Sequence, residues 1–150
     1  MNHSQTLQLS HTFATVFMTG VIWFVQVVHY PLLAGVGPQN YPAYQQQHEQ
    51  RTGWVVGPVM LFELATGILL VFYVPQRGSH LWLTVNLALL AAIWLSTFFL
   101  QVPQHQRLDS GFDPAAYHFL VVSNWIRTVA WSARSLVLFY LLANCPPKVL

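Results

Sequence analysis

The sequence predicts an all-α, membrane-embedded up-down four-helix bundle with a short interfacial helix between its first two spans. The first observation is composition: 55% of the 150 residues are hydrophobic and only 7% are charged, whereas a soluble domain carries about a quarter charged residues. The second is that three stretches, residues 12–28 with their flanks, 52–74 and 81–100, reach the roughly 20 apolar residues that a spanning helix needs. A fourth stretch, residues 119–143, is long enough but contains two arginines, so it can insert only if both face protein or water.

The helix boundaries follow from proline and capping residues. We predict spans over about residues 9–30, 53–74, 81–102 and 115–143 of a single domain that covers residues 1–150. Pro31 and Pro103 are expected to end the first and third helices, because proline cannot continue the hydrogen-bond ladder and keeps its predecessor out of the α region. Asp113 followed by Pro114 predicts the start of the last helix, with a capping carboxylate before an N-terminal proline.

The connection between the first two spans contains a polar segment, residues 41–51, whose spacing predicts the interfacial helix. Trp54 and Tyr30 are expected to mark one membrane interface, and Tyr73 and Trp82 the other, as aromatic belts do. Lysine and arginine are equally frequent on the two sides, so the orientation in the membrane stays open.

Glu63 is the only charged residue within residues 52–74. A charge at the bilayer centre costs about 2.5–3.5 kcal/mol, so such a residue is a candidate functional group that needs a partner. At a rise of about 1.5 Å per residue, Glu63 lies about 15 Å from Gly53 and Arg127 about 12 Å from Phe119, so the two are expected at similar depth and are predicted to pair. Arg134 would lie about 10 Å deeper on the same face, which makes it the less natural partner.

Most other unusual polar residues are predicted to gather in the half of the bundle that faces the first and third loops. We predict catalytic roles there for His29, His105, Arg127 and Glu63. The residues expected to bind a ligand are Gln26, His48, Arg51, Gln101 and Asn124. Two structural alternatives stay open: an ion pair that only locks two helices together, and polar side chains that only join helices by hydrogen bonds.

Several classes of site lack support in the sequence. There is no basic run or face of the kind that binds nucleic acid, and no serine, cysteine or threonine in a recognisable nucleophile setting. Glu63 is followed by Thr66 at the spacing where a di-iron bundle has histidine. No cofactor is predicted, although a metal or haem held by His29, His48 and His105 stays an alternative. What remains is acid–base chemistry by histidine beside a buried cation.

The segments Val-Pro-x-x-x-x-Leu (residues 102–108) and Asn-Trp-Ile-Arg-Thr (residues 124–128) resemble the anthrone-oxygenase-like family of small four-helix membrane proteins. Val-His-Tyr-Pro (residues 28–31) and His-Glu-Gln-Arg (residues 48–51) resemble bacterial members of unknown function. The resemblance implies a multi-pass protein of the bacterial inner membrane and cofactor-free oxygenation of a hydrophobic, anthrone-like aromatic. His29 or His105 would then remove a substrate proton, and Arg127 would stabilise the resulting enolate.

Two other functions stay open. One is a non-catalytic binder or carrier of an amphipathic ligand such as a quinone, haem or lipid, and the other is an accessory subunit of a membrane complex. The expected partners are the lipid bilayer and a hydrophobic small molecule, with a homo-oligomer as a further alternative.

Overall fold

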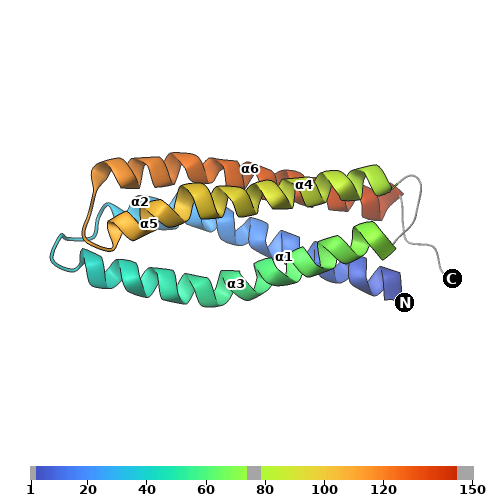
Figure 1. Cartoon of the computed structure of the whole chain (residues 1–150), viewed down its shortest axis with the longest axis horizontal. Coiled ribbons are helices and arrows are strands. Elements are labelled where there is room, and N and C mark those ends of the chain that lie inside the picture. Colours follow the sequence, from blue (N-terminus) through green and yellow to red (C-terminus); the bar gives the residue numbers. More distant parts are fainter. Residues whose placement is uncertain (1–2, 74–78, 145–150) are drawn as a thin grey trace.

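The computed structural model describes residues 3–73 and 79–144, which form four long antiparallel helical rods and contain no strand. This confirms the predicted all-α, four-helix bundle (Figure 1). The first rod comprises α1 (His3–Phe24), the π-helical turn η1 (Val25–His29) and α2 (Tyr30–Leu33), and the second is α3 (Tyr41–Tyr73). The third comprises α4 (His80–Ser96), the π-helical turn η2 (Thr97–Gln101) and α5 (Val102–Leu108), and the fourth is α6 (Pro114–Asn144).

Each rod packs against two neighbours. α1 contacts α3 and α6, and α4 contacts the same two helices from the other side. Loop 1 (residues 34–40) and loop 3 (residues 109–113) lie together at one end of the bundle, and the start of α1 and the end of α6 lie at the other end (Figure 1). The core has three layers, centred on Trp131 in the middle, on Leu120 near loops 1 and 3, and on Leu138 near the termini.

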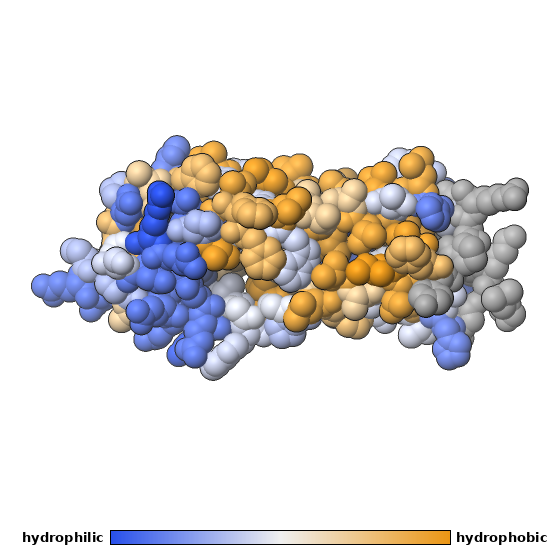
Figure 2. All heavy atoms as spheres, in the orientation of Figure 1, coloured by the Kyte–Doolittle hydropathy of each residue, from blue (hydrophilic) through white to orange (hydrophobic). Residues whose placement is uncertain are grey.

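The surface has the character expected of a multi-pass membrane protein. All four rods are long and apolar enough to cross a membrane. Large apolar side chains point outward, as in Phe13, Phe72 and Phe99, which are all more than 70% exposed. On the face drawn in Figure 2, an apolar region covers the middle of the bundle, and a hydrophilic end includes the first turns of α3. Between the two ends many polar side chains are instead buried, as in Thr15, Glu63 and Asn86, which reverses the arrangement of a soluble bundle.

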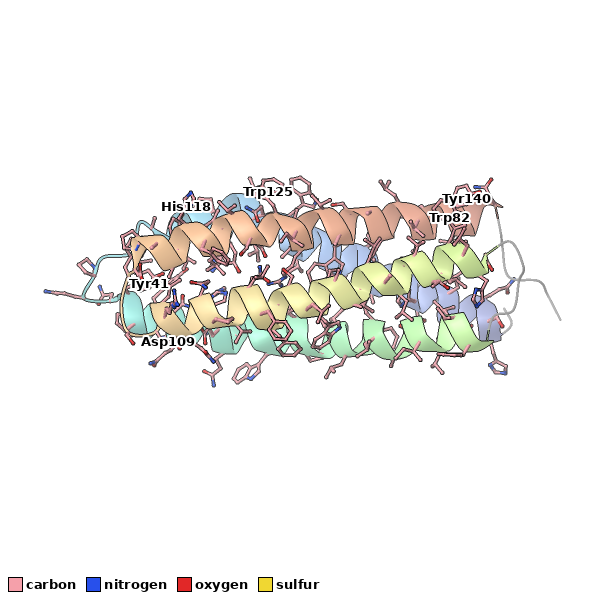
Figure 3. The ribbon with its side chains drawn as sticks, turned by 45° about the horizontal axis from the view of Figure 1, so that its top comes forward. Tyr41, Trp82, Asp109, His118, Trp125 and Tyr140 are labelled. Atoms are coloured by element: carbon pink, nitrogen blue, oxygen red, sulfur yellow. The ribbon has the colours of Figure 1, made fainter. Side chains whose placement is uncertain are left out.

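Two of the residues predicted to form aromatic belts lie at the surface. Trp54 is 70% exposed, and Trp82 packs against Tyr140 at the end of the bundle near the termini (Figure 3). Tyr30 was wrongly assigned to a belt, because its side chain is only 2% exposed and lies in the core. The side chain of Tyr73, and the loop predicted after it at residues 74–78, fall outside the described part of the chain.

The prediction that Pro31 and Pro103 end their helices was wrong. Both rods continue to Leu33 and Leu108, and in each a π-helical turn comes just before the proline. In these turns the N–H groups of Tyr30 and Val102 bond to carbonyls five residues earlier, those of Val25 and Thr97. Such π adjustments allow a proline inside a membrane helix, because they re-satisfy the backbone groups that its ring disrupts.

The expected interfacial helix is not a separate element. Residues 41–51 are helical, as predicted, but they form the first turns of the continuous helix α3, which also contains Pro58. The ribbon of α3 changes direction near its middle, where Pro58 lies (Figure 1).

The start of α6 is confirmed in detail. The Oδ1 atom of Asp113 accepts hydrogen bonds from the N–H groups of Ala115 at 2.8 Å and Ala116 at 3.2 Å, which is an N-cap. Just before it, Gly111 has a φ of +143° and is the only one of the described residues with a positive φ. Loop 3 therefore depends on a conformation that residues with a side chain rarely adopt.

We expect Gly111→Ala to lower the free energy of unfolding by about 1–2 kcal/mol, because alanine would be strained at this φ although a Cβ would meet no atom within 4 Å. Thermal unfolding in detergent measures the effect. Gly53→Ala is the control: it lies in open space on α3, where alanine should stabilise the helix by about 0.5–1 kcal/mol. Equal shifts for both variants would contradict the strain at Gly111.

Candidate functional site

A buried ion pair joins α3 to α6, but its members differ from those predicted. Glu63 pairs with Arg134, whose Nη1 donates to Oε1 of Glu63 at 2.6 Å, and both side chains are fully buried. The predicted pair of Glu63 with Arg127 was wrong. The estimate of depth began at Gly53, whereas α3 is helical from Tyr41. Measured from the starts of their helices, Glu63 lies about 33 Å deep, Arg134 about 30 Å and Arg127 only about 20 Å.

The remaining groups around this ion pair are also satisfied. Oε1 of Glu63 accepts from Thr15 at 2.8 Å, and Oε2 accepts from the indole N–H of Trp131 at 3.2 Å. Arg134 donates to Asn86 through Nε at 3.3 Å and to Thr15 through Nη2 at 3.3 Å. All four rods contribute, so this set, which we call the ion-pair network, joins the rods in the half of the bundle away from loops 1 and 3.

His11, to which the sequence analysis gave no role, belongs to the ion-pair network. Its Nδ1 lies 2.7 Å from the hydroxyl of Thr66, which itself donates to the carbonyl of Phe62. Nδ1 therefore carries the proton and donates it, which leaves Nε2 to accept from Arg134 at 3.4 Å. Its spacing of four residues from Thr15, on a face of α1 that also carries Gln8 and Thr12, was the signal that could have placed it.

Arg127 is in the opposite situation. Its side chain is only 8% exposed, yet it forms no ion pair or hydrogen bond with any residue of the described chain, and its Nε is buried without a partner. Its guanidinium lies 5.4 Å from the ring of Trp131, one turn along the same helix. Tyr30 and His105 are within electrostatic range. A buried cation without a counter-ion is costly, so this residue is the strongest candidate for contact with a ligand.

A chain of hydrogen bonds runs through His105 to Tyr30. Gln45 Nε2 donates to Oε1 of Glu49 at 3.1 Å and lies 2.8 Å from Nδ1 of His105. Because the carboxylate fixes the orientation of the amide, Nδ1 of His105 accepts a hydrogen bond, and the neutral imidazole has its proton on Nε2. Nε2 then donates to the hydroxyl oxygen of Tyr30 at 3.2 Å, which leaves the hydroxyl proton of Tyr30 free for another acceptor.

His29 and His48 stack at the outer end of this region. Their ring centroids are 4.3 Å apart at an angle of 26°, and the ring of His48 lies 5.6 Å from that of His105. Thr52 contacts Nδ1 of His48 at 3.1 Å, whereas Nε2 of His29 is buried without a partner. Both imidazoles line an open hollow of about 270 Å³, which we call the polar cleft. Its lining consists of His29, Tyr44, Gln47, His48, Arg51 and Thr52.

The two π-helical turns each point a glutamine into the bundle. Gln26 is the buried residue of η1 and Gln101 the buried residue of η2. Gln26 accepts from Asn124 at 2.7 Å and donates to a backbone carbonyl of α6, and Gln101 donates to Ser123 of α6 at 3.1 Å. These three predicted ligand-binding residues therefore join helices, although Oδ1 of Asn124 is left without a partner.

Unsatisfied buried atoms are concentrated between the middle of the bundle and loops 1 and 3. Within the described residues these atoms are His29 Nε2, Tyr41 Oη, Gln45 Oε1, Trp94 Nε1, Asp109 Oδ1, Asn124 Oδ1 and Arg127 Nε. None belongs to the ion-pair network. Because native proteins satisfy nearly all buried polar groups, these atoms are the candidates for hydrogen bonds to a ligand or to water.

The structure thus divides the predicted site residues into two groups. His29, His48, His105 and Arg127 lie in the half facing loops 1 and 3, with the exposed Arg51 at the polar cleft, whereas Glu63 lies in the ion-pair network. The sequence analysis missed Tyr30 and Gln45 as members of the site. The spacing of Gln45 and Glu49, four residues apart on a polar helix, was a signal for the hydrogen bond between them.

A metal centre gains no support from the geometry. Over residues 3–73 and 79–144, no three histidine, cysteine or acidic side chains are grouped so that they could hold a metal ion. The stacked rings of His29 and His48 lie face to face, whereas metal ligands direct their nitrogen atoms at one point.

No protein-family model, curated protein or solved structure matches this chain. The resemblance to the anthrone-oxygenase-like family therefore stays a prediction, and the site is interpreted from its own residues.

Proposed function

We propose that the protein binds a hydrophobic aromatic substrate as its oxyanion in the half facing loops 1 and 3, and oxygenates it without a cofactor. The observation that carries the proposal is Arg127, a buried cation with no counter-ion or hydrogen bond in the described chain. An anionic ligand oxygen would supply the missing charge. In a site shielded from water, such a fixed cation stabilises a developing negative charge more strongly than it would in water.

Tyr30 provides a second donor for the same oxyanion. Its hydroxyl oxygen accepts from His105, so its proton is available to a ligand, and Arg127 lies within electrostatic range. Gln45 holds His105 in the tautomer that keeps Tyr30 in this role. A hydroxyl and a guanidinium that both donate to a developing negative charge form an oxyanion hole.

His29 is better suited than His105 to take the substrate proton. Both ring nitrogens of His105 have hydrogen-bond partners, whereas Nε2 of His29 is buried, unpartnered and beside the polar cleft. A general base needs a free lone pair within reach of the proton, and histidine's ordinary pKa near 6.5 suits this task at neutral pH.

With an anthrone-like substrate the reaction has three steps. Nε2 of His29 takes a proton from the ring methylene, and the electron pair of the broken C–H bond forms an enolate that Arg127 and Tyr30 stabilise. The enolate carbon then forms a bond to dioxygen, and the reduced peroxide takes up the proton. Loss of water, with cleavage of the O–O bond and of the second C–H bond, leaves a new carbonyl. The net reaction converts one methylene and one dioxygen into one carbonyl and one water.

We expect His29→Gln to reduce turnover of an anthrone by about 10²–10⁴-fold, because glutamine cannot accept the proton. His105→Gln should have a smaller effect, because it only disturbs the orientation of Tyr30. Oxygen consumption by purified protein measures both. His118→Gln is the matched control, since His118 lies exposed on the outside of α6 (Figure 3).

Unchanged turnover in both His29→Gln and His105→Gln would remove histidine from the mechanism. If an anthrone raises the unfolding temperature of the wild-type protein without any oxygen consumption, the protein is a carrier and the oxygenase proposal fails.

A further inference from the structure

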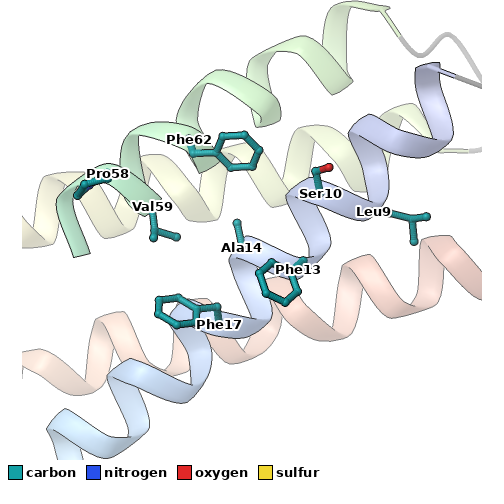
Figure 4. Close-up of a pocket in the computed structure, with 8 residues that line it drawn as sticks. All are labelled: Leu9, Ser10, Phe13, Ala14, Phe17, Pro58, Val59 and Phe62. Atoms are coloured by element: carbon teal, nitrogen blue, oxygen red, sulfur yellow. The ribbon is translucent and has the colours of Figure 1, made fainter. Parts of the chain in front are cut away.

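A second hollow lies between the same two rods as the polar cleft. It has a volume of about 720 Å³ and is bounded by α1 and α3 (Figure 4), whereas the polar cleft is bounded by η1 and α3. We call the second hollow the apolar groove. Its lining consists of Leu9, Ser10, Phe13, Ala14, Phe17, Pro58, Val59 and Phe62. The volume lies within the range of roughly 300–1,000 Å³ that small-molecule sites occupy.

The apolar groove is open because small residues face a bent helix. Ala14 and Ser10 contribute little volume on α1, and Pro58 lies where α3 changes direction. Ala14 and Val59 point toward each other across the gap, and phenylalanines form the rim (Figure 4). Of these, Phe13 is 76% exposed, so the groove opens toward the lipid.

The apolar groove and the polar cleft are connected by continuous helix faces. On α1, Phe17, Gly20 and Phe24 recur at intervals of three and four residues, and a Cβ at Gly20 would meet no atom within 4 Å. On α3, Val55 follows Arg51 by four residues and precedes Pro58 by three, and its side chain is 51% exposed. An apolar track therefore links the two hollows on the outside of the α1–α3 pair.

The two ends of this track differ in chemistry. The polar cleft is lined by two imidazoles, an arginine, a tyrosine and two uncharged polar residues, and by no carboxylate, which favours an acidic or anionic head group. The apolar groove has only one polar residue, Ser10, in its lining. His48 and Pro58 are about 15 Å apart along α3, a distance that one extended molecule can span.

We infer that the ligand of this site is a phenol-like aromatic with a long hydrocarbon tail, which enters sideways from the bilayer. Its head lies in the polar cleft, with its oxygen toward Tyr30 and Arg127, and its tail lies in the apolar groove. The position of the head rests on the proposed function, whereas the position of the tail rests on the groove alone. Ordinary lipid chains also contact this surface. The proposed ligand differs from them in its head group, which binds in the polar cleft and so fixes the position of the tail in the apolar groove.

The experiment uses 4-dodecylphenol with a photoreactive diazirine near the end of its chain, added to the full-length protein in phosphatidylcholine nanodiscs. Peptide mapping after illumination should place most of the label on residues 9–17 and 58–62. Gly20→Trp, which fills the track, should lower this labelling about tenfold, and Ala14→Leu, which fills the floor of the groove, should lower it as well. Gly53→Trp is the matched control: it also lies in open space but is not part of the lining of either hollow.

The outcomes separate the two proposals. Label spread evenly over all lipid-facing helices, or an equal loss in Gly20→Trp and Gly53→Trp, overturns the position of the tail. If labelling of the groove is retained in Arg127→Met, the tail site stands and the proposed oxyanion site fails. If unsubstituted phenol competes with dodecylphenol at equal concentration and the competition depends on Arg127, the oxyanion site stands and the tail contributes nothing.

Discussion

Arg134→Met is expected to lower the free energy of unfolding by about 3–5 kcal/mol, the largest effect on stability of any single replacement considered. The substitution would leave Glu63 as an unpaired charge at a position with no exposed surface. Breaking a buried ion pair from one side costs this much because the remaining charge keeps its desolvation penalty and loses its partner. The loss should appear as a lower unfolding temperature and poorer yield of folded protein in detergent.

Two further variants make the expectation specific. Replacing both partners, with Glu63→Leu and Arg134→Met together, should restore most of the lost stability, because apolar residues of similar size can substitute for a buried pair. Arg127→Met, on the same helix, should leave the stability unchanged or raised, since it removes a buried cation that has no counter-ion among the described residues. Equal losses of stability in Arg127→Met and Arg134→Met would contradict the structure, in which Arg134 has a counter-ion and Arg127 has none among the described residues.

The four rods could be predicted from sequence because apolar stretches of sufficient length leave few alternatives in a bilayer. The start of α6 was also predictable, because the carboxylate of Asp113 accepts hydrogen bonds from backbone N–H groups only two and three residues later in the sequence. The ends of the first and third rods were not. Whether Pro31 or Pro103 ends a helix depends on a π-helical turn just before it, and no residue pattern in the sequence marks those turns.

The site was predicted less completely, because its pairings depend on the depth of residues on different helices. An error in where α3 begins was enough to exchange Arg134 for Arg127 as the partner of Glu63. Tyr30 was missed for a related reason: beside Pro31 it resembled a residue at the end of a span, but the helix continues past it and turns its hydroxyl inward. The position of the histidines near loops 1 and 3 was predictable, because it depends only on the up-down order of the helices and not on the exact depth of each residue.

Arg127→Met is expected to reduce turnover of an anthrone by about 10²–10³-fold while the protein stays folded, because it removes one donor to the oxyanion. If Arg127 acts mainly on the charge that develops as the proton leaves, kcat should fall more than KM rises. Arg127→Lys should recover part of the activity, since lysine keeps the charge but lacks the planar set of donors.

The control for this loss is Arg107→Met, an exposed arginine at the same end of the bundle, which should retain full activity. Retained activity in Arg127→Met would mean that the unpaired cation has no part in the reaction, and the oxyanion site would then have to be abandoned. A parallel loss in Arg107→Met would instead mean that overall positive charge at this end attracts the substrate, an effect that added salt would weaken. A loss confined to Arg127→Met and insensitive to salt would therefore identify a direct contact inside the bundle, because a buried charge is screened far less than an exposed one.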